Sequence, residues 1–188
     1  TDPFPPVPTG TVVSPSADVH GSGSSGVQIT APATDDNIYQ DHVFEATDLA
    51  GDWLASTWGN PVQAITFDFY DGGSGYSPDE LAVYVQASGF TWYYSLTPPT
   101  DAFVGWSSYT VNLLGGTGWT SPDSPNGLLD DIGSVTRAGI LITYQSETAV
   151  SQLYGIRDYT LHDEILGYIP EPGTYVVPST ALMSLGFT

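Results

Sequence analysis

Short runs of alternating apolar and polar residues, separated by turn residues, are the feature that most limits the fold of this 188-residue chain. Ile65, Phe67 and Phe69 alternate with polar neighbours, a period of two that places one face of a strand against a core. A glycine-rich turn follows at residues 71–75. The alternation recurs in Leu81, Val83 and Val85; Phe90, Trp92, Tyr94 and Leu96; Tyr109, Val111 and Leu113; and Ile140, Ile142 and Tyr144. With a last strand over residues 154–161, the pattern predicts an all-β sandwich or jelly roll.

Composition favours the same fold class. The chain has 21 glycines and 15 prolines but only 12% charged residues, which suits short strands joined by turns better than long helices. One short helix is expected where Leu128, Leu129, Ile132 and Val135 fall at helical spacing. The length suggests a single domain with a real core. Because there is no cysteine, stability must come from packing or from a metal ion.

The charge balance excludes some partners. The only basic residues are Arg137 and Arg157, against 21 carboxylates, which gives a formal net charge of −19. Such a surface repels phosphate backbones and anionic lipid headgroups, so we expect no nucleic-acid partner and no peripheral membrane binding. It suits high salt or a divalent cation.

The chain divides into three segments by composition. Residues 1–36 form a Pro-, Gly- and Ser-rich stretch that predicts an extended N-terminal arm, either a spacer or a strand donor to a sheet edge. Residues 37–167 contain the strand pattern, and residues 168–188 are an apolar tail with no charge after Glu171. A start at Thr1 fits a mature protein whose secretion signal has been removed, so we expect an extracellular location.

The tail opens with Pro170-Glu171-Pro172 ahead of an apolar run. This triplet resembles the PEP-CTERM sorting signal of bacterial surface proteins, which an exosortase reads. In that family a membrane-spanning helix and a basic cluster follow. Here the basic cluster is absent and the run is shorter than the ~20 apolar residues that cross a bilayer. Membrane attachment is therefore expected only if a C-terminal anchor is retained.

Several weak motifs over residues 45–161 occur in a characteristic order. The stretches are 49–53, 58–59, 64–69, 79–85, 106–113, 118–119, 128–132, 138–144 and 154–161. Together they resemble a laminin B (laminin IV type A) domain. The resemblance implies a jelly-roll sandwich similar to carbohydrate-binding modules and no enzymatic activity. Arg157 departs from the family, which usually has a small or acidic residue there.

Calcium is the cofactor that this resemblance suggests. A cation often ties the first strand to the last in such domains, which would here recruit Asp48 or Asp52 and Asp158. Calcium prefers six to eight oxygen ligands from carboxylates and loop carbonyls. Asp71 and the pair at 130–131 are weaker alternatives. Asp71 is also explained as a turn former, and the pair is also explained as acidic residues near a helix N-terminus.

Catalytic patterns do not appear in the sequence. His20, His42 and His162 are far apart and show no metal or triad spacing, and no nucleophile elbow, HExxH or phosphate-binding loop occurs. An enzyme is therefore not expected.

Aromatic residues are the candidate ligand contacts. Tyr84 and Tyr93 lie opposite the apolar phase of their strands, so we expect them to be exposed and able to stack on sugar rings.

The sequence thus predicts a non-catalytic, secreted cell-surface or matrix protein with an exosortase-type address. One alternative is a subunit of an extracellular filament, joined by strand addition through its terminal segments. The residues proposed for that assembly are Val27, Ile29, Tyr175, Val176, Val177, Leu182, Leu185 and Phe187. The other alternative is a carbohydrate-binding module with a polysaccharide partner.

Overall fold

A computed structural model describes residues 12–16, 26–31, 39–45, 49–54, 61–72, 77–100, 104–145 and 152–163. Within these, residues 12–16, 31, 39–45, 115 and 144–145 are described by their backbone alone. The sorting triplet Pro170, Glu171 and Pro172 and the tail residues proposed for assembly lie outside the described residues. Among the described helices, none is long and apolar enough to cross a membrane.

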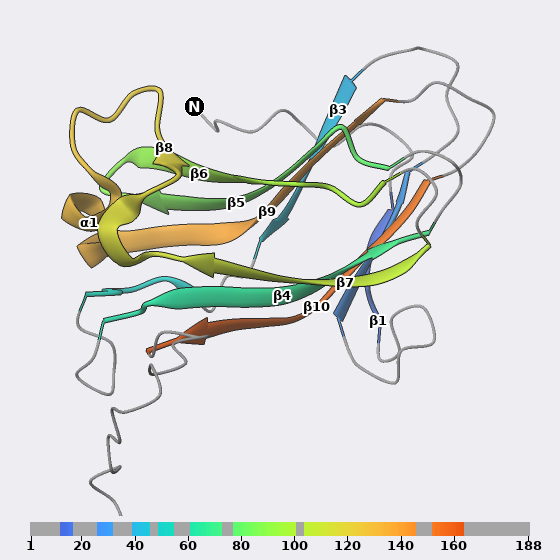
Figure 1. Cartoon of the computed structure of the whole chain (residues 1–188), viewed down its shortest axis with the longest axis horizontal. Helices are drawn as coiled ribbons and strands as arrows, with labels where there is room; N and C mark the ends of the chain where they lie inside the picture. The colour runs from blue at the N-terminus through green and yellow to red at the C-terminus, as the bar shows by residue number, and fades with distance from the viewer. Residues whose placement is uncertain are drawn as a thin grey trace, which may run out of the picture.

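The domain is a jelly-roll sandwich of two five-stranded sheets with antiparallel neighbours, which confirms the predicted fold class (Figure 1). Sheet A has the order β1 (Val12–Ser16), β2 (Gly26–Ala31), β10 (Gln152–His162), β4 (Ala64–Asp71) and β7 (Gly105–Asn112). Sheet B has the order β3 (Tyr39–Glu45), β9 (Val135–Gln145), β5 (Glu80–Ala87), β6 (Phe90–Leu96) and β8 (Trp119–Thr120). Short 3₁₀ turns lie at η3 (Leu114–Gly116) and η4 (Ile132–Ser134).

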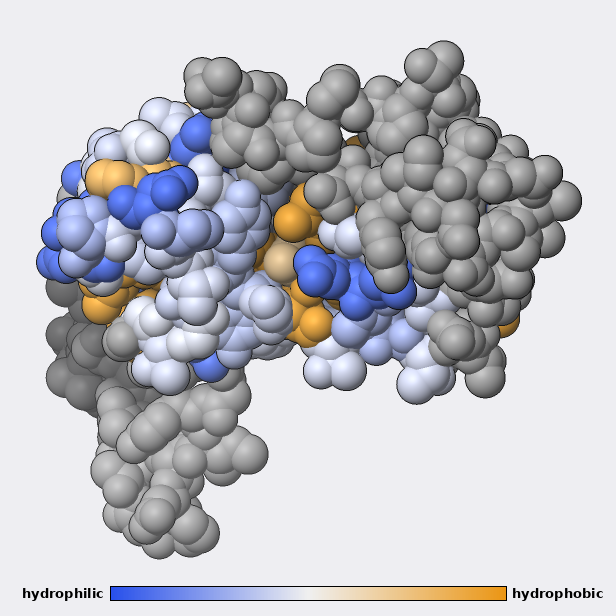
Figure 2. All heavy atoms as spheres, turned by 90° about the horizontal axis from the view of Figure 1, so that it is seen from above, coloured by the Kyte–Doolittle hydropathy of each residue, from blue (hydrophilic) through white to orange (hydrophobic). Residues whose placement is uncertain are grey.

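The core lies between the two sheets and is built by the alternating residues of the strands. Phe67 and Phe69 of β4 are 2% and 0% exposed, and they face Val83 and Val85 of β5 within one cluster. Seen from above relative to Figure 1, the described surface is mainly polar and shows apolar atoms only in small areas (Figure 2). Burial of the apolar faces of both sheets supplies the main driving force for folding.

The N-terminal segment contributes strands β1 and β2 to the sandwich, so the sheets extend ahead of residue 37. Strand β2 lies inside sheet A, paired on one side with β1 and on the other with β10. Ile29 is completely buried and Val27 packs against the core. In this structure both residues pack within their own chain, and their proposed role in assembly stays a prediction. Pro15 lies in edge strand β1, where a missing ladder donor is tolerated.

The predicted short helix is confirmed. A single turn, α1 (Leu128–Asp131), is continued by η4, and Leu128 and Ile132 are both buried. Gly127 precedes the helix and donates its N–H to the Asp130 carboxylate at 3.1 Å. Asp130 therefore caps the helix N-terminus, where a negative charge is favourable.

Gly72 marks a close approach between β4 and β10. Its N–H donates to the carbonyl oxygen of Leu153 at 2.8 Å, and an added Cβ would lie 2.7 Å from that oxygen. We expect Gly72→Ala to lower the free energy of unfolding by about 1 to 3 kcal/mol, because a backbone atom must move. Urea denaturation measures the loss. Gly127→Ala is the matched control, since its Cβ would meet nothing closer than 3.5 Å; an equal loss in both variants would contradict the prediction.

Candidate functional site

The outer face of sheet A carries a connected set of polar and aromatic contacts among the described residues. Because Phe67 and Phe69 point into the core, their neighbours on β4 point away from sheet B. Strand register places Asp68 opposite Ser108 of β7 and Arg157 of β10. We use "outer face" for Thr66, Asp68, Tyr70, Trp106, Ser108, Arg157, Asp158 and His162.

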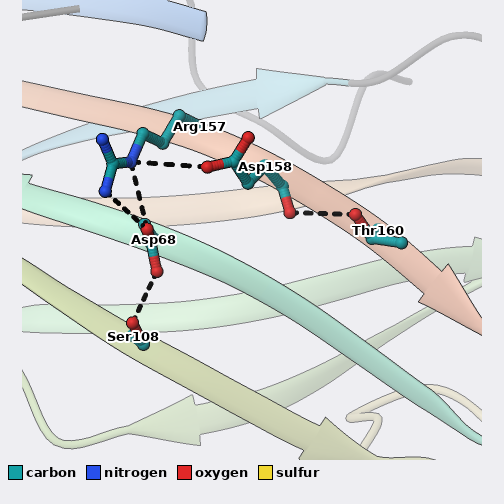
Figure 3. A network of polar contacts seen from close by, with 5 residues as sticks. All are labelled: Asp68, Ser108, Arg157, Asp158 and Thr160. Atoms are coloured by element: carbon teal, nitrogen blue, oxygen red, sulfur yellow. Dashed lines mark hydrogen bonds and ion pairs between the residues drawn. The ribbon is translucent and has the colours of Figure 1, made fainter. Parts of the chain in front are cut away.

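An ion-paired cluster occupies the middle of this face (Figure 3). Arg157 donates from Nε and Nη2 to Oδ2 of Asp68 at 3.0 and 2.9 Å, and Ser108 donates to Oδ1 of the same carboxylate at 2.6 Å. The Asp158 carboxylate lies 3.5 Å from Arg157 Nε. The side chains of Arg157, Asp68 and Asp158 are 19%, 21% and 60% exposed. The guanidinium is thus held in place at the surface.

Two aromatic rings adjoin this cluster. The guanidinium carbon of Arg157 lies 4.1 Å from the centroid of the Trp106 ring, a cation–π contact. Trp106 and Tyr70 are cross-strand partners, with ring centroids 5.2 Å apart and planes tilted by 52°. Both side chains are half-buried. The face therefore presents aromatic surface directly beside fixed hydrogen-bonding groups.

A β-bulge shapes this part of β10. The pairing with β4 shifts between Arg157 and Thr160, and Asp158 has a φ of 55°. Thr160 donates its hydroxyl to the Asp158 carbonyl at 3.1 Å. The extra residue lets Arg157 stay on the outer face while Tyr159 returns to the core, where it stacks on Phe67. Bulges often re-aim side chains in this way.

A hydrogen bond between Thr66 and His162 lies at the other end of the face. The hydroxyl of Thr66 lies 2.8 Å from Nε2 of His162, and the bond is partly buried. His162 therefore has a hydrogen-bond partner within the face. His20 lies outside the described residues, and His42 is described by its backbone alone.

The two tyrosines predicted as sugar contacts lie on sheet B and differ in exposure. Tyr84 and Tyr93 are cross-strand partners opposite the core phase, as the alternation predicts. Tyr84 is nevertheless completely buried, so the expectation that it is exposed is wrong. Strand β5 is buried on both faces, and Gly139 on the other neighbouring strand leaves room beside the ring. Tyr93 is half-buried.

The partly buried tyrosines that pack against the core are poor ligand groups. Burial raises the pKa of Tyr159 above its ordinary value, and the nearby Tyr84 adds to the shift. Burial also raises the pKa of Tyr109, with a further contribution from the negative charge of Asp71. The Tyr109 hydroxyl donates to the carbonyl of Thr97 at 2.9 Å. These phenols stay protonated at neutral pH and serve packing.

The calcium ligands stay a prediction. Asp48 lies outside the described residues, Asp52 accepts a hydrogen bond from the Leu54 N–H at 2.9 Å, and Asp158 lies beside Arg157. The described residues contain no group of three or more His, Cys, Asp or Glu side chains that could hold a metal ion. Asp71 accepts a hydrogen bond from Ser77 at 2.7 Å.

Sequence reasoning did not identify the outer face, although part of its signal is readable. Asp68 and Tyr70 alternate with the core phenylalanines, and Trp106 alternates with Tyr109 and Val111 in the opposite phase. Nothing in the sequence says that β10 lies beside β4, which is what brings Arg157 to them.

The sequence matches no family model, and no curated protein was found to match it. Solved structures show a likeness of fold. A family 11 carbohydrate-binding module from Clostridium thermocellum, in complex with a β-1,3-1,4-mixed-linked tetrasaccharide, is 19% identical with a TM-score of 0.49, covering 82% of this chain and 84% of the module. An exo-β-agarase is 16% identical with a TM-score of 0.50, covering 83% of this chain and 23% of that chain. At such identities the likeness concerns the fold alone.

Proposed function

We propose that this domain is a non-catalytic carbohydrate-binding domain of an extracellular protein, and that the outer face of sheet A binds the glycan. Function has to be argued from side chains, because one fold hosts many functions. The observation that carries the proposal is the aromatic pair Tyr70 and Trp106 beside the fixed guanidinium of Arg157.

Sugars combine apolar ring faces with a rim of hydroxyl groups, so their binding sites need aromatic surface and hydrogen-bonding groups together. The outer face has both within one short stretch. Trp106 and Tyr70 offer half-buried rings, while Arg157 offers N–H donors and the Ser108 hydroxyl oxygen can accept a hydrogen bond, both side chains being held by Asp68. Because these groups are fixed before a ligand arrives, binding does not have to order them.

The contacts of Asp68 favour binding over catalysis. Both of its carboxylate oxygens already accept hydrogen bonds, one from Ser108 and the other from Arg157. A general acid or base must exchange a proton with its substrate, whereas this carboxylate is used to position its neighbours.

The extracellular setting is part of the proposal. The triplet Pro170-Glu171-Pro172 supports an exosortase-type address, and the resemblance to laminin B domains supports a surface or matrix role. In such a protein the domain would hold the cell surface or the matrix to a polysaccharide.

The proposal is tested by measuring the affinity of the purified protein for a panel of soluble oligosaccharides by calorimetry. We expect Trp106→Ala and Tyr70→Ala each to weaken binding of the best ligand by about tenfold or more, as aromatic anchors do in other interfaces. Near-ultraviolet circular dichroism checks that each variant is folded.

Tyr93→Ala is the matched control, because Tyr93 is a half-buried tyrosine on the opposite sheet. It should leave the affinity unchanged. Binding that is lost in Tyr93→Ala and kept in Trp106→Ala would move the site to sheet B. No binding to any oligosaccharide of the panel would overturn the proposed function.

A further inference from the structure

Asp158 has a feature that the proposed function does not explain. Its φ of 55° lies in the left-handed region, where glycine is favoured and other residues are strained. Asparagine and aspartate tolerate this conformation best among the rest. Aspartate at this position thus adds a carboxylate to the face at a conformational cost that glycine would avoid.

The carboxylate of Asp158 is not needed to hold Arg157. Two hydrogen bonds of 3.0 and 2.9 Å fix the guanidinium on Asp68, whereas Asp158 lies 3.5 Å from Nε and its side chain is 60% exposed. An ion pair this exposed contributes little to stability. Its effect is therefore mainly on the charge that a ligand meets.

The net charge of this cluster is negative. The cluster sets one guanidinium against the carboxylates of Asp68 and Asp158, and Arg137, the only other basic residue of the chain, lies on β9 in sheet B. Among the contacts of the described residues, Nη1 of Arg157 has no acceptor, and Figure 3 shows it pointing away from both carboxylates. A ligand oxygen that binds Nη1 thus approaches a guanidinium whose positive charge is already compensated by the two neighbouring carboxylates.

We propose that Asp158 is a specificity-determining residue, which makes the outer face select uncharged glycans over glycans that carry carboxylate or sulfate groups. The inference rests on the proposed function. A hydroxyl or ring oxygen accepts a hydrogen bond from Nη1 without electrostatic penalty. An anionic group gains attraction from the guanidinium but meets Asp158 and the overall negative field, which removes the advantage.

The test uses the neutral oligosaccharide that binds most tightly and two derivatives of it. One carries a few carboxymethyl groups, and the other carries the same groups as methyl esters, at a substitution level at which the ester still binds. The two derivatives differ in charge and hardly in size. Affinities are measured at low ionic strength with a chelator present, so that a bound divalent cation plays no part.

We expect the wild-type protein to bind the ester at least about tenfold more tightly than the acid. In Asp158→Asn, which keeps the left-handed conformation, the acid should gain affinity relative to the ester, so that this ratio falls by about fivefold. Asp158→Gly removes the same charge on a backbone that suits glycine, and it repeats the test if the asparagine variant misfolds. Asp123→Asn is the matched control, because it removes one charge from an exposed residue between β8 and α1.

Wild-type protein that binds acid and ester equally would overturn the inference. So would an ester-to-acid ratio that stays the same in both Asp158 variants, or one that falls as far in Asp123→Asn. Each of these results leaves the neutral glycan bound, and with it the proposed function. Failure of the proposed function shows instead as no binding to any neutral oligosaccharide.

Discussion

A chain that begins at residue 37 should fail to fold, although the sequence pattern makes residues 37–167 look like the complete domain. Truncation removes β1 and β2, and with them the ladder between residues 26–31 and β10. It also empties the core position of Ile29 and uncovers Tyr154 and Ile156, which are buried opposite Ile29 and Val27 respectively. Losing one buried isoleucine typically costs about 2 to 5 kcal/mol, and here a whole strand is lost from a domain whose total stability is expected near 5 to 15 kcal/mol.

The measurement is near-ultraviolet circular dichroism and thermal unfolding of residues 37–188 beside the full chain. Point variants in β2 measure how much single side chains contribute to the free energy of unfolding. Ile29→Ala should lower the free energy of unfolding by about 2 to 5 kcal/mol, whereas Thr30→Ala, whose side chain points to the other face of β2, should cost less than about 1 kcal/mol. A truncated protein with the spectrum and melting temperature of the full chain would show that the first two strands are dispensable.

This truncation also shows where sequence reasoning stops. Strands β4, β5 and β6 were predictable because each has its own alternation and its own turn residues. Apolar and polar residues alternate as clearly in β2, but this strand lies in a Pro- and Gly-rich segment. Its partner β10 is also more than a hundred residues away in the chain. A local sequence pattern indicates that a segment is extended, but it does not indicate with which strand that segment pairs.

The same limit applies to the candidate site. The outer face takes Asp68 from β4, Trp106 from β7 and Arg157 from β10, so its composition depends on strand order. Alternation identified the outward phase of each strand, and it did so correctly for Tyr84 as well. It could not show that β5 is buried on both faces. Exposure depends on what covers a face, and that is a property of the tertiary structure.

Among the described residues, Asp131 should be the polar side chain whose loss destabilises the domain most. It is 3% exposed at the end of α1 and accepts three hydrogen bonds. The Trp92 indole and the Ser124 hydroxyl donate to Oδ2 at 3.1 and 3.0 Å, and the Asn126 amide donates to Oδ1 at 3.4 Å. The carboxylate thereby ties the segment between β8 and α1 to a tryptophan of the core.

In Asp131→Ala the buried indole N–H of Trp92 loses its acceptor, and so does the Ser124 hydroxyl. Leaving buried donors unsatisfied costs more than an ordinary hydrogen bond contributes, so we expect a loss of about 2 to 4 kcal/mol. For a chain of this size that corresponds to a fall in melting temperature of roughly 5 to 15 °C. The near-ultraviolet signal of Trp92 should change as well, because its surroundings are altered.

Two comparisons separate hydrogen bonding from other effects. Asp131→Asn keeps a carbonyl oxygen for Trp92 and Ser124, and its amide nitrogen can donate to Asn126 once that side chain flips to present its oxygen, so it should cost clearly less than Asp131→Ala. Asp130→Ala removes an exposed carboxylate from the same helix turn, where only the cap on Gly127 is lost, at a cost of about 1 kcal/mol. If Asp130→Ala and Asp131→Ala lower the stability equally, the buried network does not hold this end of the sandwich, and helix capping alone explains the role of both aspartates.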